Sequence, residues 1–109
     1  MSFVTQWGRN LTQNQLSDVD VVQWIWSRLA DDPEEVERST CARDQLLELG
    51  LTMMDVFCAL KAPADIGRDY LGGCFVVTGC DLDGHSLTVV VAPPSEKNRL
   101  RIVKVWRGK

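Results

Sequence analysis

The chain has 109 residues, of which 45% are hydrophobic and 25% are charged, and its net charge is −3. This length and composition predict one globular domain over residues 1–109, and the acidic balance argues against broad affinity for nucleic acid. No apolar run approaches the roughly 18 residues of a membrane span, and the start MSFVTQWGRN lacks the pattern of a secretory signal. We therefore expect a soluble, cytoplasmic protein without membrane contact.

The first 16 residues show weak patterning, because Asn, Gln and Thr dominate them. We expect residues 1–16 to form a loosely patterned N-terminal arm or a short extra edge strand. Phe3 and Trp7 are the side chains of this arm that are available to dock on the body of the domain.

The first helix is predicted over residues 18–30, where Ser17 and Asp20 form a capping-box pattern. Its core stripe, with Val21 and Ile25 beside it, is predicted to be Val19, Val22, Trp26 and Leu29. Trp24 lies off the centre of this stripe, so it either covers the flank of the helix, which is the commoner case, or is exposed for binding. The pattern of residues 33–40 fits both a short helix and extended chain.

Two more helices are predicted on either side of Gly50, over residues 41–49 and 52–61. Glycine is common just past a helix end, where the chain adopts a left-handed conformation. Thr52 with Asp55 three residues later repeats the capping-box pattern and marks a fresh helix start. The sequence therefore predicts two short helices with a tight turn between them.

The rest of the chain predicts a sheet. Residues 64–72 are polar and predict a loop, and three apolar, β-branched segments then predict strands over 74–80, 86–92 and 100–106. Asp83-Gly84 is a strong hairpin signal between the first two. Helices followed by antiparallel strands indicate an α+β fold, with three helices on one face of a sheet of three strands, or four if the arm adds one. The central strand should be 86–92 or 100–106.

The four cysteines are spaced 17, 16 and 6 residues apart, at Cys41, Cys58, Cys74 and Cys80. Structural zinc sites usually carry closely spaced ligand pairs, so packed free thiols are expected, without a metal or another cofactor. The single His85 lies in a predicted turn. Asp81-x-Asp83-Gly84 is similar to the start of a calcium loop, but Ala92 stands at the twelfth position, where that loop needs Glu.

The end of the chain is basic. Residues 97–109 hold six basic groups and no acidic one. Charged side chains often protect an exposed strand edge from pairing with other strands, and this is the simplest interpretation of the basic residues. The alternative is a binding surface for RNA or an acidic partner, with Trp106 available for base stacking. The candidate binding residues are Arg99, Arg101, Lys104, Trp106 and Arg107.

Two stretches of the chain resemble a known family. The first carries Ser39, Ala42, Leu46, Gly50, Leu51, Thr52, Asp55 and Val56, and the second carries Gly79, Asp81, Asp83, Gly84 and Leu87 before the basic last strand. This pattern resembles domain-of-unknown-function family 4258, which is related in fold to the RelE/ParE and MqsR-type toxins. The resemblance covers roughly residues 18–107 and implies a RelE/MqsR-like scaffold.

The departures from the family pattern bear on function. Cys41 stands where the family has His, and Gln45 and Leu49 stand where it has Arg. Imidazole moves protons and guanidinium holds phosphate, which these replacements cannot do in the same way. We therefore expect a non-catalytic interaction protein with an antitoxin-like partner or a second copy of itself. The alternative is an mRNA-cleaving, metal-independent ribonuclease of a toxin–antitoxin pair, and a redox or small-molecule role of the thiols is a third hypothesis.

Overall fold

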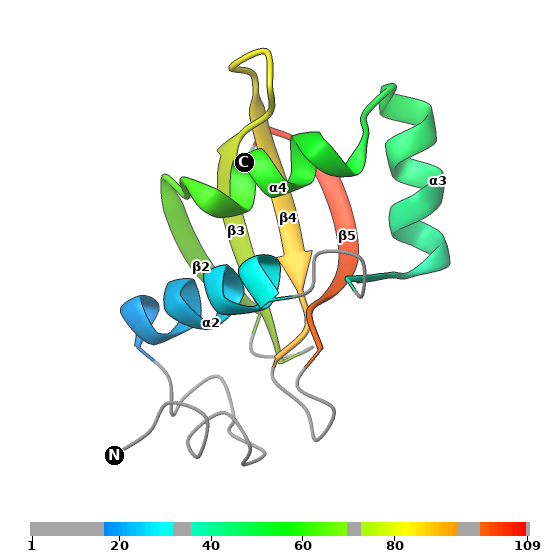
Figure 1. The fold of residues 1–109 in the computed structure, drawn as a ribbon. Helices are drawn as coiled ribbons and strands as arrows, with labels where there is room; N and C mark the ends of the chain where they lie inside the picture. The colour runs from blue at the N-terminus through cyan, green and yellow to red at the C-terminus, as the bar shows by residue number, and fades with distance from the viewer. Residues whose placement is uncertain (1–16, 32–35, 70–72, 94–98, 109) are drawn as a thin grey trace.

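The computed structural model describes residues 17–31, 36–69, 73–93 and 99–108. In this part of the chain it shows an α+β fold, as the sequence predicts, with three helices and a five-stranded mixed sheet (Figure 1). The elements are α2 (Asp18–Asp31), β1 (Glu37–Arg38), α3 (Thr40–Leu49), α4 (Met53–Lys61), β2 (Asp65–Asp69), β3 (Cys74–Cys80), β4 (Ser86–Val91) and β5 (Arg101–Arg107).

The sheet has the strand order β1-β5-β4-β3-β2. β1 runs parallel to β5, and the other neighbouring pairs are antiparallel. β4 is therefore the central strand, which is one of the two positions expected from the sequence. The prediction of a sheet of three or four strands was wrong, because β1 and β2 extend the sheet at its two ends. An edge strand from residues 1–16 lies outside the described residues.

β2 corrects the prediction of a polar loop over residues 64–72. It pairs with β3 in a regular antiparallel register, from Asp65 opposite Thr78 to Asp69 opposite Cys74. Only Ile66 is a strong strand former in this segment, so pairing and packing decide its conformation rather than intrinsic propensity. Arg68 supports the strand by lying over the ring of Phe75, at 5.4 Å from the ring centroid.

β1 settles part of the ambiguity over residues 33–40, since Glu37 and Arg38 are extended. The Glu37 N–H donates to Leu100 O at 2.9 Å, and the Ser39 N–H donates to Ile102 O at 3.0 Å. Residues 32–35 lie outside the described part. The short strand therefore places the start of α3 beside β5.

α3 and α4 begin and end within one residue of their predicted limits. The Ser39 hydroxyl accepts the Ala42 N–H at 3.0 Å at the start of α3, and Gly50 ends it with φ 68°. The Asp55 carboxylate accepts the Thr52 N–H at 2.9 Å at the start of α4. Local side-chain signals decide these limits, which is why they can be read from sequence.

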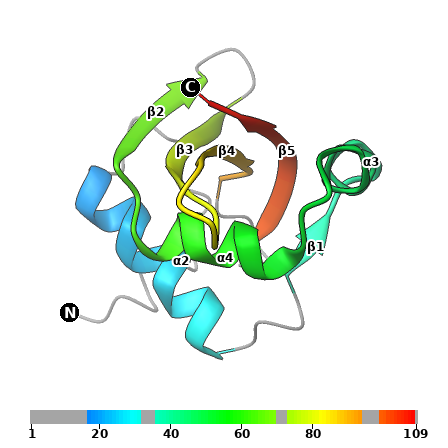
Figure 2. The same cartoon turned by 90° about the horizontal axis from the view of Figure 1, so that it is seen from above.

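The prediction that all three helices pack on one face of the sheet was wrong. α4 lies over β3 and β4, and α2 crosses the same face beside α4. α3 instead stands at the edge of the sheet, against β5 and β1 (Figure 2). The core therefore forms between the sheet and the pair α2–α4, while α3 covers one edge.

α2 turns a different stripe toward the core from the one predicted. The buried residues are Val21, Trp24, Ile25 and Leu29. Val19 is 64% exposed and Trp26 is 46% exposed, although both were predicted to be core. Trp24 is fully buried, so its packing alternative is correct. Two neighbouring stripes of this helix are apolar, so helical spacing alone cannot decide which one is buried.

The close approach of α4 to β3 depends on Gly79. A Cβ added at this glycine would lie 2.5 Å from Ala59 O and 2.9 Å from Ala59 Cα, both backbone atoms of α4. A side chain of any size would therefore push the helix away from the sheet.

We predict that Gly79→Ala lowers the free energy of unfolding by about 1–3 kcal/mol, because overpacking must be relieved by backbone movement. The matched control is Gly67→Ala in β2, where the nearest atom to an added Cβ is 3.8 Å away. This control should stay within about 1 kcal/mol of the wild type. Urea denaturation measures both, and equal effects of the two substitutions would contradict the close approach.

Candidate binding surfaces

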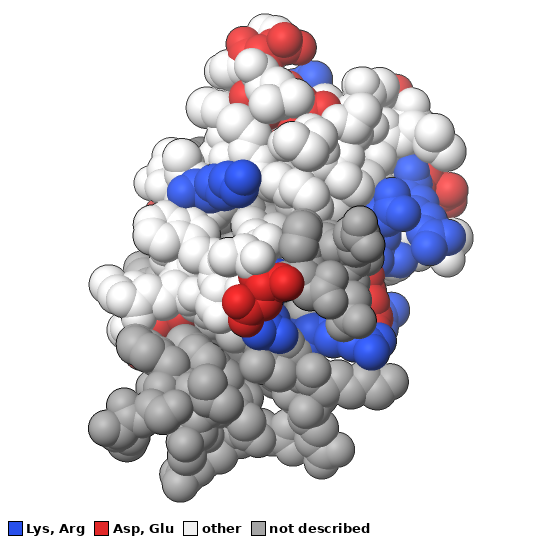
Figure 3. Space-filling model, viewed as in Figure 1, with Lys and Arg blue, Asp and Glu red and all other residues white. Residues whose placement is uncertain are grey.

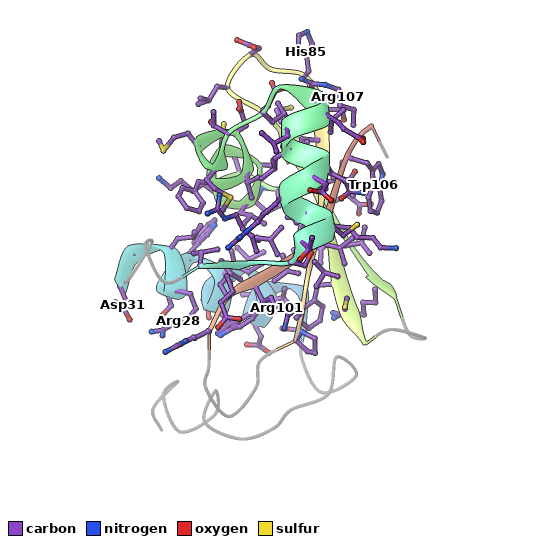
Figure 4. The ribbon with its side chains drawn as sticks, turned by 90° about the vertical axis from the view of Figure 1, so that its right-hand side faces the viewer. Arg28, Asp31, His85, Arg101, Trp106 and Arg107 are labelled. Atoms are coloured by element: carbon purple, nitrogen blue, oxygen red, sulfur yellow. The ribbon has the colours of Figure 1, made fainter. Side chains whose placement is uncertain are left out.

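Arg107, one of the candidate RNA-binding residues, is held in an ion pair with a buried carboxylate. Its Nη1 donates to Asp81 Oδ2 at 2.7 Å, and the Asp81 side chain is completely inaccessible. Asp81 Oδ1 also accepts the backbone N–H groups of Asp83 and His85, each at 2.9 Å. Figure 4 shows Arg107 at the end of the sheet that carries the His85 hairpin. Arg107 therefore fastens the end of β5 to the β3–β4 hairpin.

These contacts shift the acidity of Asp81. The Arg107 guanidinium lowers the pKa of Asp81 below its ordinary value, burial opposes this, and the N–H groups of His85 and Asp83 lower it further. Asp55 behaves similarly, because hydrogen bonds from the backbone N–H groups of Thr52 and Leu82 lower its pKa against the effect of burial. The Leu82 N–H donates to Asp55 Oδ1 at 3.1 Å, so the two carboxylates join α4, the hairpin and β5.

The other candidate residues, in β5 and just before it, do not lie together with Arg107. Arg99 Nη1 lies 3.3 Å from Glu37 Oε1 in an ion pair that is about half exposed. Lys104 and Trp106 lie opposite Val90 and Thr88 of β4, whereas Arg107 lies opposite Leu87. Side chains alternate along strands, and Leu87 is paired with Gly79, which contacts α4. Lys104 and the half-buried Trp106 therefore lie on the face of the sheet opposite α4, which we call the helix-free face because no described helix lies on it.

Arg101 belongs to the same helix-free side, because its neighbour Ile102 points into the core. It stands at the opposite end of β5 from Trp106 and Arg107 (Figure 4). The structure thus brings together Lys104 and Trp106, with Arg101 farther along the same face. It does not bring Arg107 onto this face, and Arg99 is ion-paired with Glu37, the residue opposite Arg101.

Of the three positions that differ from the family pattern that the sequence resembles, Gln45 has a visible local role. Gln45 Oε1 accepts the Val105 N–H at 2.7 Å, so this side chain covers the outer edge of β5. Leu49 is half-buried. Cys41 is exposed on α3 and Cys80 is exposed on β3, which corrects the prediction that the thiols are packed; Cys58 and Cys74 are half-buried.

A hollow between β1, α3 and the start of α4 was missed by sequence reasoning. Its volume is about 360 Å³, and we call it the arginine-rimmed hollow. Its lining residues are Arg38, Arg43, Leu46, Leu47, Leu51, Thr52 and Met53. Both arginines lie in the acidic part of the chain, so charge counting by segment did not single them out. The one local signal is Arg43 with Leu47 a turn later on the same helix.

The exposed side of α2 forms a second candidate surface, which we call the α2 stripe: Val19, Val22, Gln23 and Trp26. These four residues line a hollow of about 330 Å³. Trp26 Nε1 donates to Leu60 O at 3.2 Å, which anchors the indole to the end of α4. Trp26 also lines a second hollow of about 430 Å³, together with Leu29, Ala30 and Lys61. Figure 3 shows this region of α2 largely without charged side chains.

The β3–β4 hairpin holds one group of three possible metal ligands among the residues that the structure describes. The ligand atoms of Asp81, Asp83 and His85 lie within 4.8 Å of one another. Asp81 already accepts hydrogen bonds from Arg107 and two backbone N–H groups. These bonds account for the position of its carboxylate without a cation.

Comparisons with known proteins give no match, whether to a family model, a curated protein or a solved structure. The resemblance to the RelE-related family therefore stays a prediction. Across residues 17–31, 36–69, 73–93 and 99–108, no helix is long and apolar enough to cross a membrane.

We predict that Asp81→Asn destabilises the protein at neutral pH, because the amide is a weaker partner for Arg107 and for the two N–H groups. The folded-state pKa of Asp81 is lowered, so its contribution is present above the unfolded pKa and is lost as pH falls through the folded one. The difference from wild type should therefore shrink below about pH 5.

The matched control is Asp83→Asn, which removes an exposed carboxylate from the same hairpin. Thermal unfolding measured as a function of pH compares the three proteins. A difference between wild type and Asp81→Asn that is absent at neutral pH, or that does not change with pH, would contradict the assignment.

Proposed function

We propose that this protein is a non-catalytic interaction module that associates with a second copy of itself through the α2 stripe. The observation that carries the proposal is an uncharged, largely apolar row on the outer side of a helix whose inner side is core. Trp26 and Val19, both in this row, are among the exposed large apolar side chains of the described residues. Tryptophan is enriched among the residues that supply most of the energy at protein interfaces.

The stripe is complementary to itself. Its residues follow the spacing i, i+3, i+4 and i+7, which is one face of a helix. In an antiparallel pair of α2 helices related by a two-fold axis, Val19 faces Trp26 of the second copy, and Val22 faces Gln23. The same contacts then occur twice, as a two-fold interface requires. No charge is buried in this arrangement.

The size of the α2 stripe limits the expected strength of self-association. With 14 residues, α2 is about 21 Å long. A helix face of this length is smaller than the roughly 800 Å² that each partner buries in a standard stable interface. The association should therefore be weak and reversible, and its extent should depend on concentration.

The family resemblance supports the non-catalytic part of the proposal. Of the positions with His or Arg in that family, Gln45 here bonds the edge of β5 and Cys41 is an exposed thiol on α3. We propose the RelE/MqsR-like scaffold on the order of the elements, with helices preceding a set of antiparallel strands.

The test is the molar mass in solution, measured by light scattering during size-exclusion chromatography over a range of concentrations. Wild type should gain mass as concentration rises, whereas Trp26→Glu and Val19→Glu should stay monomeric. Val19→Glu leaves the Trp26–Leu60 hydrogen bond intact, so it guards against a folding defect. Leu82→Glu is the matched control, because Leu82 is 62% exposed in the remote hairpin. A wild type that is strictly monomeric up to millimolar concentration would refute self-association.

A second candidate function is RNA binding or cleavage on the helix-free face. The observation that favours it is the position of Lys104 beside Trp106, with Arg101 on the same side, since cations with an aromatic ring suit single-stranded RNA. Arg107 and Arg99 are engaged with carboxylates, which leaves this surface fewer cations than the sequence had indicated.

If this surface binds RNA, Arg101→Ala with Lys104→Ala should weaken binding of a labelled oligonucleotide and relieve any toxicity of induced expression in bacteria. Binding should also fall steeply with salt, because phosphate contacts release counterions. The matched control is Lys61→Ala on α4, which lies away from this face. Unimpaired growth, intact RNA and no oligonucleotide binding at low salt would rule this candidate out.

A further inference from the structure

The arginine-rimmed hollow combines two cations with an aliphatic floor at a corner of the fold that is held by hydrogen bonds. We propose that it binds a segment of a protein partner in which a carboxylate stands next to an aliphatic side chain. This site is separate from the α2 stripe, and the proposal does not depend on self-association.

The two arginines at the rim differ from three other arginines that the structure describes. Arg28, Arg99 and Arg107 each form an ion pair with a carboxylate. Within the described residues, no carboxylate pairs with Arg38 or Arg43, and both residues are exposed. A guanidinium binds a carboxylate in a bidentate way, which gives an incoming acidic group both energy and orientation.

The backbone that carries these arginines is fixed. Ser39 stands directly after Arg38, and its hydroxyl donates to Val103 O at 2.6 Å while it accepts the Ala42 N–H at 3.0 Å. Ser39 thus ties the end of β1 to the bulged part of β5 and to the first turn of α3. Arg43 follows in that turn, so both side chains extend from anchored positions and a ligand need not order the backbone.

The floor of the hollow is aliphatic and is also held in place. Gly50 ends α3 with φ 68°, and its N–H donates to Leu47 O at 3.2 Å. The Leu51 N–H then donates to Leu46 O at 2.9 Å, which folds Leu51 back beside the end of the helix. Leu47 is 80% exposed, so it gives a partner an apolar contact that nothing else in the described structure covers.

The positive character of the hollow depends on the two guanidinium groups. The start of α4 also borders it through Thr52 and Met53. The carboxylate of Asp55 already accepts the Thr52 N–H and hydroxyl, at 2.9 and 3.2 Å, so the positive end of this helix is compensated within the protein. Removing the charges of Arg38 and Arg43 should therefore remove the attraction for anions.

The lining favours a protein segment over nucleic acid. Its described lining residues include no aromatic side chain on which a base could stack, and the chain as a whole has a net charge of −3. Leucine and methionine side chains instead suit an aliphatic residue of a partner. A volume of about 360 Å³ has room for a few side chains and not for a folded element. The fitting occupant is an acidic, aliphatic stretch of a partner chain.

The first experiment selects a displayed library of random dodecapeptides against the full-length protein. Enriched sequences should combine Asp or Glu with Leu, Ile or Val within a few residues. Synthetic copies should bind the wild type, and affinity should fall at least about tenfold in the double variant Arg38→Glu with Arg43→Glu. Leu47→Ser should weaken binding independently of charge. A synthetic peptide with Gln and Asn in place of Glu and Asp should bind poorly.

The matched control is Arg101→Glu, which reverses an exposed arginine outside the hollow and should leave the affinity unchanged. Val19→Glu, which disrupts the α2 stripe, should also leave it unchanged, so failure of self-association and failure of this site are told apart. The proposal is overturned if no peptide is enriched or if the enriched peptides are basic. It is also overturned if the charge-reversed double variant binds them equally well, or if an oligonucleotide and not a peptide depends on Arg38 and Arg43.

Discussion

The ion pair between Arg107 and the buried Asp81 is the contact on which the packing of this fold depends. Burying a carboxylate is costly unless its oxygens are occupied, and here the guanidinium and two backbone N–H groups occupy them. With Asp55, which bonds the hairpin at Leu82, the pair fixes the end of β5, the β3–β4 turn and the start of α4 in one place. The basic tail of the sequence is therefore partly structural, and a count of its charges overstates what is free to bind a ligand.

The edge of β5 explains the position of α3. An uncovered strand edge presents free N–H and C=O groups that invite unwanted pairing. β1 covers the first part of this edge, the Ser39 hydroxyl bonds Val103 O, and the Gln45 amide bonds the Val105 N–H. A side chain at position 45 must accept a hydrogen bond from the backbone, which an arginine cannot do. The same placement separates α3 from α4 and leaves the arginine-rimmed hollow between them.

Local signals predicted much of the fold, and long-range packing decided the rest. Ser39, Gly50 and the Thr52–Asp55 pair act within one helical turn, so the limits of α3 and α4 were readable from sequence. β2 was missed because its conformation depends on β3, and the buried face of α2 was wrong because two adjacent stripes are equally apolar. The hollow was missed for the same reason as β2, since Arg38 and Arg43 meet Leu51 and Met53 only after β1 has paired with β5.

The two proposed surfaces differ in chemistry and position, and these differences allow them to act independently. The α2 stripe crosses the helix-covered face of the sheet, whereas the hollow lies at the β1–α3 edge (Figures 1 and 2). Contacts between apolar residues are strengthened by sulfate or phosphate salts, while attraction between guanidinium and carboxylate groups is screened by salt. Adding such a salt should therefore favour association through α2 and oppose occupation of the hollow. If both proposals hold, the protein binds an acidic segment while it is paired with a second copy.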